Sequence, residues 1–164
     1  MSAPDTFRYW LEPSHVESKC IFCKIADGRI KPGGRHDPSE LVYENDKVVV
    51  FNDMNPGARQ HFLVIPKRHL KNCWSLNQGL LDEMDKVADE ILEFRNPHGE
   101  SSRKFFIRPP WNSVYHVHLH VMIGDLTDSF CDLRKIGFQS AWFHITPNQL
   151  RKEMNWSGAN EETH

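Results

Sequence analysis

Three histidines alternate with aliphatic residues in one short segment of this chain. His116, His118 and His120 are separated by Val117 and Leu119. Successive side chains of a β-strand point to opposite faces of the sheet, so this segment predicts a strand with three imidazoles on one face. At a rise of ~3.3 Å per residue, neighbouring imidazoles would lie about 7 Å apart. Packing alone explains such a face poorly, although surface histidines on an edge strand are the structural alternative.

Two kinds of chemistry fit this histidine face. A His-x-His pair on a strand directs both side chains toward one metal ion. Alternatively, one imidazole attacks an electrophile while its neighbours position a phosphate. The histidine pattern by itself leaves both interpretations open.

The composition indicates an ordinary globular domain. The chain has 164 residues, of which 39% are hydrophobic and 26% charged, and its net charge of −2 gives no direct signal for nucleic acid or for an anionic membrane. No apolar run reaches the ~20 residues that cross a bilayer, and residues 1–19 contain no apolar signal segment. We therefore expect an intracellular protein, in the cytoplasm or also in the nucleus. There, four cysteines are expected to be thiols or metal ligands: Cys20, Cys23, Cys73 and Cys131.

The order of predicted elements indicates an α+β protein. The clearest helix spans 78–95, where apolar residues recur at helical period. We expect an N-terminal extension (1–19), a core domain (20–124) and a C-terminal extension that packs on the core (125–164). The expected sheet is an antiparallel meander of about five strands, from segments 41–44, 47–52, 61–65, 104–107 and 114–123. Short helices are expected at 21–30 and 146–154.

Taken with its surroundings, the histidine segment resembles the histidine-triad (HIT) superfamily, whose signature alternates three histidines with apolar residues. Residues 20–25, 51–56, 61–69 and 113–115 resemble other motifs of that family, in the family's order. The C-terminal part, with Trp142 to His144, looks more like the Hint-3 and aprataxin side of the family than the smaller Hint proteins. The chain lacks the Trp-Pro-Pro-Gly tail of those smaller relatives, and Asn112 and Ser113 stand where the Fhit branch carries a glutamine.

This resemblance implies the HIT fold and a hydrolase that cleaves adenosine 5′-phosphoramidates to AMP and an amine through a nucleotidyl-histidine intermediate. Its partner would be a purine nucleotide, and Hint relatives are commonly homodimers. A dinucleoside polyphosphate hydrolase and a non-enzymatic nucleotide-binding adaptor are the alternatives.

Four residues are candidates for the chemistry. His118 is the expected nucleophile, because it is central in the histidine row and the family assigns that position. His120 would donate to a phosphate oxygen, and Ser113 to the phosphate or the leaving group. His61 could complete the polar cluster from a neighbouring strand, or could simply be a strand histidine with satisfied hydrogen bonds.

The resemblance also implies a nucleoside pocket beside the phosphate. Asp53 would accept hydrogen bonds from the ribose, although an Asp before a Pro-Gly turn can be only a turn former. The slot residues could equally be core residues. The full set implied is Ile21, Phe22, Ile25, Phe51, Asn52, Asp53, Met54, Asn112, Ser113, His118 and His120.

The Cys20-x-x-Cys23 pair is half of a tetrahedral zinc site. In cysteine-bearing members of the superfamily the other half corresponds to His69 and His116, so the resemblance implies one structural Zn²⁺. The alternative is a pair of buried thiols without metal.

Overall fold

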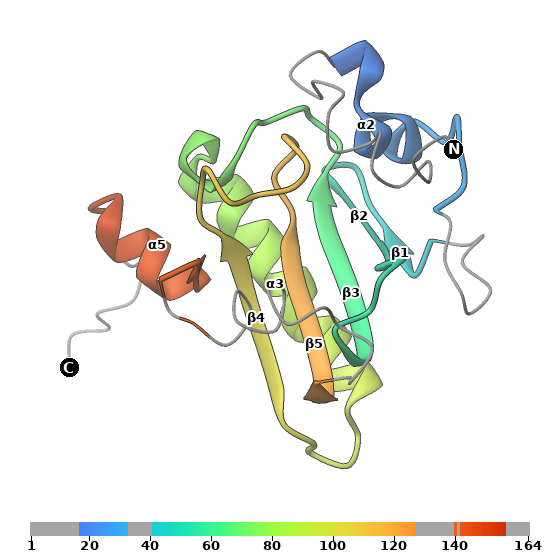
Figure 1. The fold of residues 1–164 in the computed structure, drawn as a ribbon, viewed down its shortest axis with the longest axis vertical. Helices are drawn as coiled ribbons and strands as arrows, with labels where there is room; N and C mark the ends of the chain where they lie inside the picture. The colour runs from blue at the N-terminus through green and yellow to red at the C-terminus, as the bar shows by residue number, and fades with distance from the viewer. Residues whose placement is uncertain (1–16, 33–40, 127–139, 141, 157–164) are drawn as a thin grey trace, which may run out of the picture.

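The structure is a computed structural model, and it describes residues 17–32, 41–126, 140 and 142–156. Within these residues, one sheet of six strands has the order β1-β2-β3-β5-β4-β6, and each pair of neighbouring strands is antiparallel (Figure 1). The strands are β1 (Tyr43–Glu44), β2 (Val48–Asn52), β3 (Ala58–Pro66), β4 (Ser102–Ile107), β5 (Leu119–Leu126) and β6 (His144–Ile145). The helical elements are η1 (Glu17–Lys19), α2 (Ile21–Ala26), η2 (Cys73–Ser75), α3 (Gln78–Arg95) and α5 (Pro147–Glu153).

The α+β prediction with one main helix is confirmed, with a sixth strand added. The sheet departs from a strict meander at one point, because β5 lies between β3 and β4. Strands β3 and β4 each pair antiparallel with β5, so they run parallel to each other. Parallel strands need a long crossover connection, and α3 supplies it.

Helix α3 has the predicted bounds, because its capping residues and the apolar residues along its buried face define the same segment. The Asn77 side chain caps its start by accepting a hydrogen bond from the Leu80 N–H at 2.9 Å, and Asn96 follows its last turn. Leu81, Met84 and three further apolar residues of α3 are buried in the main core, against one face of the sheet. The other sheet face is thereby left for the functional side chains.

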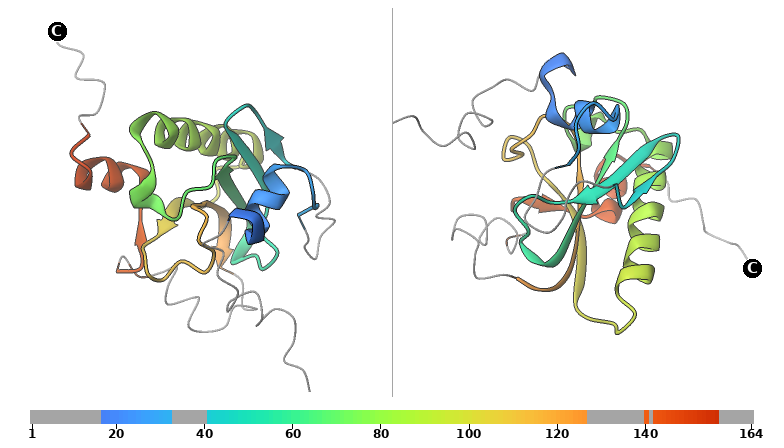
Figure 2. Two further views of the ribbon diagram at one scale, coloured as in Figure 1. Left: turned by 90° about the horizontal axis from the view of Figure 1, so that it is seen from above. Right: turned by 90° about the vertical axis from the view of Figure 1, so that its right-hand side faces the viewer.

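Helix α2 covers part of that second face. Figure 2 shows α3 and α2 on opposite sides of the sheet. Phe22 and Ile25 of α2 pack there with Phe51 of β2 in a separate buried cluster. The helix ends at Ala26 rather than near residue 30, because the chain turns at Gly28, whose φ of +69° suits glycine.

The histidine strand begins later than predicted. Strand β5 starts at Leu119, so His116 and His118 lie in the loop before it. The Val117 N–H donates to the Leu70 carbonyl at 2.7 Å rather than to a strand neighbour. The alternation of faces survives, since Val117 and Leu119 are buried in the α3 core. The expected spacing of about 7 Å was wrong, because the His118 and His120 ring centroids lie 4.9 Å apart.

The described part of the C-terminal region packs beside β4. Strand β6 pairs with the end of β4, and α5 begins with a capping box formed by Thr146 and Gln149. Leu150 of α5 is fully buried, and Arg108 at the end of β4 forms an ion pair with Glu153 at 2.8 Å. In the described part of the chain, no helix is long and apolar enough to cross a membrane.

Candidate active site

His118 is held as a neutral imidazole with a defined tautomer. Its side chain is buried, and its Nδ1 lies 2.7 Å from the His116 carbonyl oxygen. A carbonyl only accepts, so Nδ1 carries the proton and Nε2 keeps a lone pair. Burial lowers the pKa of His118, against smaller opposing effects of the His116 carbonyl and Asp53. His118 therefore offers an unprotonated nitrogen at neutral pH.

His120 has the complementary tautomer. The Gly57 N–H donates to His61 Nδ1 at 3.0 Å, so that nitrogen carries no proton and His61 Nε2 does. His61 Nε2 lies 2.8 Å from His120 Nδ1 and donates to it. A neutral His120 then carries its own proton on Nε2. The two adjacent triad rings thus differ chemically: His118 presents a lone pair and His120 presents an N–H.

Asp53 joins this polar cluster. One carboxylate oxygen lies 3.5 Å from His61 Nε2, and the other accepts from the Asn55 N–H at 2.9 Å. The ligating atoms of Asp53, His61 and His120 lie within 4.8 Å of one another, as a metal site would require. However, the Nδ1 lone pair of His61 accepts a hydrogen bond from the Gly57 N–H. The Nε2 of a neutral His61 therefore carries the proton and has no lone pair that could bind a metal ion. This cluster is better described as a chain of hydrogen bonds.

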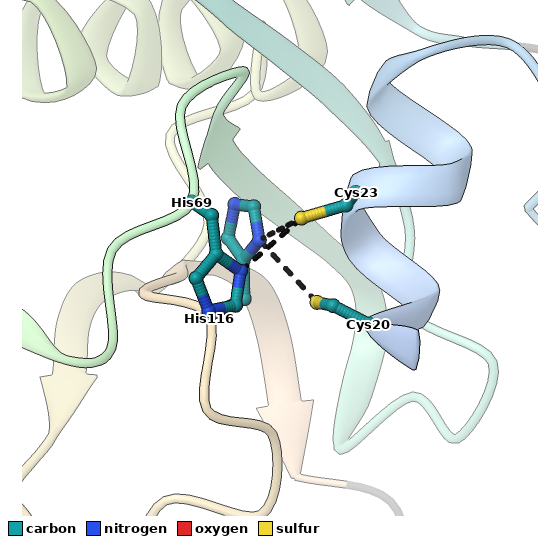
Figure 3. A group of neighbouring side chains, drawn as sticks. All are labelled: Cys20, Cys23, His69 and His116. Atoms are coloured by element: carbon teal, nitrogen blue, oxygen red, sulfur yellow. Dashed lines mark hydrogen bonds between the residues drawn. The ribbon is translucent and has the colours of Figure 1, made fainter. Parts of the chain in front are cut away.

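A second cluster, made of two cysteines and two histidines, has the chemistry of a metal site. Figure 3 shows Cys20 and Cys23 of α2 facing the rings of His69 and His116. The Cys23 sulfur lies 3.1 Å from His69 Nδ1 and 3.4 Å from His116 Nδ1, and the Cys20 sulfur lies 3.5 Å from His116 Nδ1. Ligand atoms of a tetrahedral zinc with bonds of about 2.0–2.3 Å lie roughly 3.5 Å apart. The four residues therefore fit such an ion.

The surroundings of this cluster support the fit. His116 Nε2 donates to the Pro66 carbonyl at 2.8 Å, which leaves Nδ1 to face the sulfurs. Burial lowers the pKa of His116 to about 4, so the ring is neutral. Burial, together with Cys20, raises the pKa of Cys23 to about 12. Without an ion that thiol keeps its proton, and a bound metal would displace it.

Four of the expected nucleoside residues, Ile21, Phe22, Ile25 and Phe51, pack together on the α2 side of His118. The Phe22 ring contacts the rings of His118 and Phe51, with centroids 5.2 and 5.6 Å apart. Phe22, Ile25 and Phe51 are buried, as core residues are, whereas Met54 is 46% exposed. Ile21, Asn52 and Asp53 are half-buried. These residues remain predicted nucleoside contacts.

The loop before the triad borders His118 from another direction. A small pocket is lined by His118, Asn112 and Val114, together with Lys71, Asn72, Cys73, Phe106, Ile107 and Val117. Asn112 is buried, and its Nδ2 donates to the Val114 carbonyl at 3.2 Å. Ser113, the predicted phosphate or leaving-group donor, is half-buried in the same loop.

Three groups that shape the site were not among the predicted residues. The Gly57 N–H and the Pro66 carbonyl set histidine tautomers. Phe105 stacks on His120, with centroids 5.3 Å apart and planes inclined by 15°. Phe105 is the cross-strand partner of His120, so a correct strand register would have indicated it. Backbone groups give no signal in the sequence beyond the Pro56-Gly57 turn.

Comparison with known proteins identifies the family of this chain. The model of the family described as "Scavenger mRNA decapping enzyme C-term binding" matches residues 19–136. The chain is 30% identical over 159 residues to "Adenosine 5'-monophosphoramidase HINT3" of Mus musculus, covering 93% of this chain and 89% of that protein. The Xenopus tropicalis protein of the same name is 31% identical over 152 residues, covering 90% of this chain and 95% of that protein.

A solved structure gives the same result. A HIT family hydrolase from Legionella pneumophila Philadelphia 1 is 30% identical, with a TM-score of 0.57, covering 65% of this chain and 94% of the other. The sheet, its crossover helix and the histidine site together define a HIT-fold hydrolase. The chain belongs to the histidine-triad superfamily, and within it to the neighbourhood of the Hint-3 proteins.

Proposed function

We propose that this protein hydrolyses adenosine 5′-phosphoramidates to AMP and an amine through a nucleotidyl-His118 intermediate. The observation that carries the proposal is the tautomer of His118, whose Nδ1 is committed to the His116 carbonyl and whose Nε2 keeps its lone pair. The phosphoramidase activity for which the Mus musculus and Xenopus tropicalis relatives are named supports the same reaction.

The chemistry proceeds in two displacements at phosphorus. His118 Nε2 attacks, a P–Nε2 bond forms and the phosphorus–amine bond breaks. The amine leaves with the bonding pair and takes a proton from water. Water then attacks phosphorus, the P–Nε2 bond breaks, and AMP leaves as the water proton passes to solvent.

Neighbouring groups stabilise both displacements. The His120 Nε2–H donates to a phosphoryl oxygen, where negative charge grows. His61 holds His120 in the donating tautomer by donating to its Nδ1. Ser113 donates from the loop before the triad, to the phosphate or to the leaving group.

The nucleoside lies on the α2 side of His118 in this proposal. Ile21, Phe22, Ile25, Phe51 and Met54 supply an apolar slot for the purine, and Asn52 and Asn112 border the nucleotide. Asp53 accepts from the ribose hydroxyls. The Phe22–His118 ring contact supports this direction, because it joins the slot to the nucleophile.

We also propose that one zinc ion is bound by Cys20, Cys23, His69 and His116. Four protein ligands would leave no position for substrate or water, so the ion would supply structure rather than catalysis. The sulfur–nitrogen distances and the Pro66 hydrogen bond to His116 support this assignment.

A homodimer in the cytoplasm, and also in the nucleus, completes the proposal. The comparison proteins support only the nucleotide partner. Light scattering on the purified protein tests the dimer, since a mass near 19.2 kDa in solution would mean a monomer. Fractionation of cells that express the protein tests its compartment.

A turnover comparison tests the reaction itself. Unsubstituted AMP phosphoramidate and diadenosine polyphosphate are supplied separately to the wild type and to His118→Ala. We expect amine release from the first substrate only, and a loss of roughly 10⁴-fold or more in the variant. Faster cleavage of diadenosine polyphosphate would favour the other hydrolase, and AMP binding without any turnover would favour an adaptor.

A further inference from the structure

The His120 ring has an aromatic neighbour that the proposed displacements do not use. Phe105 of β4 stacks on that ring, with centroids 5.3 Å apart and planes inclined by 15°. The two residues are cross-strand partners, so the register of β4 against β5 brings their side chains together. Phe105 is only 2% exposed, which keeps it from touching a substrate. Any effect of Phe105 on the reaction therefore acts through His120.

A single hydrogen bond leaves the plane of the His120 ring incompletely defined. His61 Nε2 donates to His120 Nδ1 at 2.8 Å, and this contact fixes one atom of the ring. The last side-chain torsion of histidine is broad, so the ring can still turn about that atom. A ring that lies flat against a buried neighbour loses this freedom, because turning either opens a gap or presses atoms together. The stack on Phe105 supplies this second restraint.

Phe105 is held in turn by a residue of the C-terminal region. The centroids of the Phe105 ring and the His144 ring of β6 lie 5.1 Å apart, with planes inclined by 42°. Strand β4 lies between β5 and β6, so His120 and His144 approach Phe105 from different sides of its strand. Ala58 and Met122 complete a small buried cluster with Phe105. Two ring contacts thus connect β6 with the active site.

We propose that Phe105 is a positioning residue that directs the His120 Nε2–H at the phosphoryl group, and that His144 supports Phe105 in this role. Hydrogen bonds weaken steeply as they depart from a straight line, so a turned His120 ring would stabilise the growing negative charge less well. This inference rests on the proposed phosphoramidase reaction. It adds a route by which the C-terminal region acts on the step at phosphorus.

The alternative is that Phe105 only fills space in the protein interior. In that case its loss would lower the stability of the fold, and any effect on the rate would be the same with and without the His120 side chain. A positioning residue behaves differently, because its effect depends on the side chain that it positions. Combining substitutions at the two sites therefore separates the two roles.

The experiment compares Phe105→Leu in two backgrounds, the wild type and His120→Ala. The rate of adenylylation of His118 is measured in a single turnover of AMP phosphoramidate, and the affinity for AMP is measured by titration calorimetry. Phe105→Tyr is included because it keeps a flat ring. Phe62→Leu is the matched control, since Phe62 is also buried but packs in the main core on the α3 side.

We expect Phe105→Leu to slow adenylylation roughly 10-fold, which is less than the ~10²–10³-fold cost of losing a whole oxyanion donor. The AMP affinity should change little, and Phe105→Tyr should keep most of the rate. In the His120→Ala background, Phe105→Leu should have no further effect. Phe62→Leu should leave the rate per folded molecule unchanged in both backgrounds. An equal loss from Phe105→Leu in both backgrounds, or an unchanged rate in the folded variant, overturns the inference.

If Phe105→Leu does not fold, the half-buried His144 tests the same route. His144→Ala should slow adenylylation by less than a change at Phe105 would, because it removes the support of the stack and not the stack itself. This loss should vanish in the His120→Ala background. No loss in the presence of His120, or a loss that persists without it, contradicts the proposed route.

A spectroscopic measurement separates this inference from the proposed reaction. In protein with ¹⁵N-labelled histidine, the His120 Nε2–H resonance is the one missing from His120→Ala, and AMP should shift it downfield as the proton is donated to the phosphate. If the wild type shows no adenylylation, the proposed reaction fails, and this shift still decides the role of Phe105. The shift should be smaller in Phe105→Leu and unchanged in Phe62→Leu. A shift of full size in Phe105→Leu would mean that Phe105 does not position His120.

Discussion

At the residue scale, two adjacent imidazoles acquire different roles from the backbone groups that they contact. The His116 carbonyl accepts a hydrogen bond from the Nδ1–H of His118. The Gly57 N–H, acting through His61, assigns the opposite tautomer to His120. Neither assignment needs a charged partner. The site therefore holds a nucleophile and a hydrogen-bond donor side by side.

The pH dependence of the first chemical step follows from the burial of His118. Its folded pKa lies below the ordinary value of 6.5, because burial disfavours the charged ring. The adenylylation rate should therefore hold as the pH falls to 6.5, and should decline only as the pH passes through the lower, folded pKa. Single-turnover rates across pH check this. A decline centred above 6.5 would contradict a buried, neutral nucleophile.

The same shift predicts how stability changes with pH. Unfolded His118 takes up a proton near pH 6.5, before the folded protein does, so the unfolded state binds more protons below that pH. The contribution of this group to the free energy of unfolding is present above pH 6.5 and decreases as the pH falls below it.

Asp53 should set the preference for ribose. Replacing Asp53 with Ala should weaken AMP binding by about 1–3 kcal/mol, the cost of losing a hydrogen bond to a charged group. Binding of 2′-deoxy-AMP should change less. Because Asp53 also lies 3.5 Å from His61, the difference between AMP and deoxy-AMP affinities is the readout rather than the rate. Equal wild-type affinities for the two nucleotides would exclude this role.

At the element scale, helix α2 and the loop before β5 are joined through the Cys/His cluster. Cys20 is the N-cap residue of α2 and Cys23 lies in its first turn, whereas His116 belongs to the loop that also carries the nucleophile. The carbonyl that orients His118 is the carbonyl of His116. A change in the Cys/His cluster should therefore alter the orientation of His118 through one residue, His116.

Removal of zinc should test this coupling. Purified protein should contain about one zinc per chain, and a strong chelator should lower its melting temperature, because ligand order and folding are coupled. His69→Ala should do the same. The adenylylation rate should fall through loss of order at His116, with AMP affinity less affected. Elemental analysis and thermal melts measure both effects.

Cys73→Ala is the matched control for this experiment, since Cys73 is buried but lies in the α3 core. It should keep the full zinc content. Absence of zinc after expression in metal-rich medium would remove the site, and zinc that depends on His118 or His120 would contradict the nucleophilic mechanism.

The sequence predicted elements that depend on local contacts better than it predicted boundaries that depend on contacts between distant segments. The limits of α3 follow from its period and its Asn77 cap, both of which are local. The start of β5 depends on a contact between Val117 and Leu70, which are distant in the chain. For the same reason the histidine row was predicted but its tautomers were not, because they depend on the His116 and Pro66 carbonyls and the Gly57 N–H.

At the scale of the whole molecule, the two faces of the sheet have different roles: one packs on the main hydrophobic core, and the other carries the side chains of the candidate active site. Helix α3 and the main core cover one face, and α2 lies on the other (Figure 2). On that second face, Phe22 of α2 contacts the rings of His116 and His118. The C-terminal elements extend the β4 side of the sheet, where β6 pairs with β4.

This separation predicts that core substitutions alter stability without altering chemistry. Leu81 of α3 is fully buried, so Leu81→Ala should lower the free energy of unfolding by about 2–5 kcal/mol. The adenylylation rate per folded molecule should stay unchanged. Denaturant unfolding and single-turnover kinetics measure the two quantities. Phe94→Ala, on the same helix but exposed, should change stability by no more than about 0.5 kcal/mol; a slow but fully folded Leu81→Ala enzyme would argue against the separation.

The central claim is that His118 Nε2 carries the nucleotide between the two displacements. Radiolabelled AMP phosphoramidate is mixed with the wild type, the reaction is quenched within the first turnover, and the protein is digested for mass spectrometry. The account predicts an AMP adduct on the peptide that contains residues 116–120, located on His118 and missing in His118→Ala. An adduct on another residue, or complete hydrolysis by the wild type without any adduct at the earliest times, would contradict it.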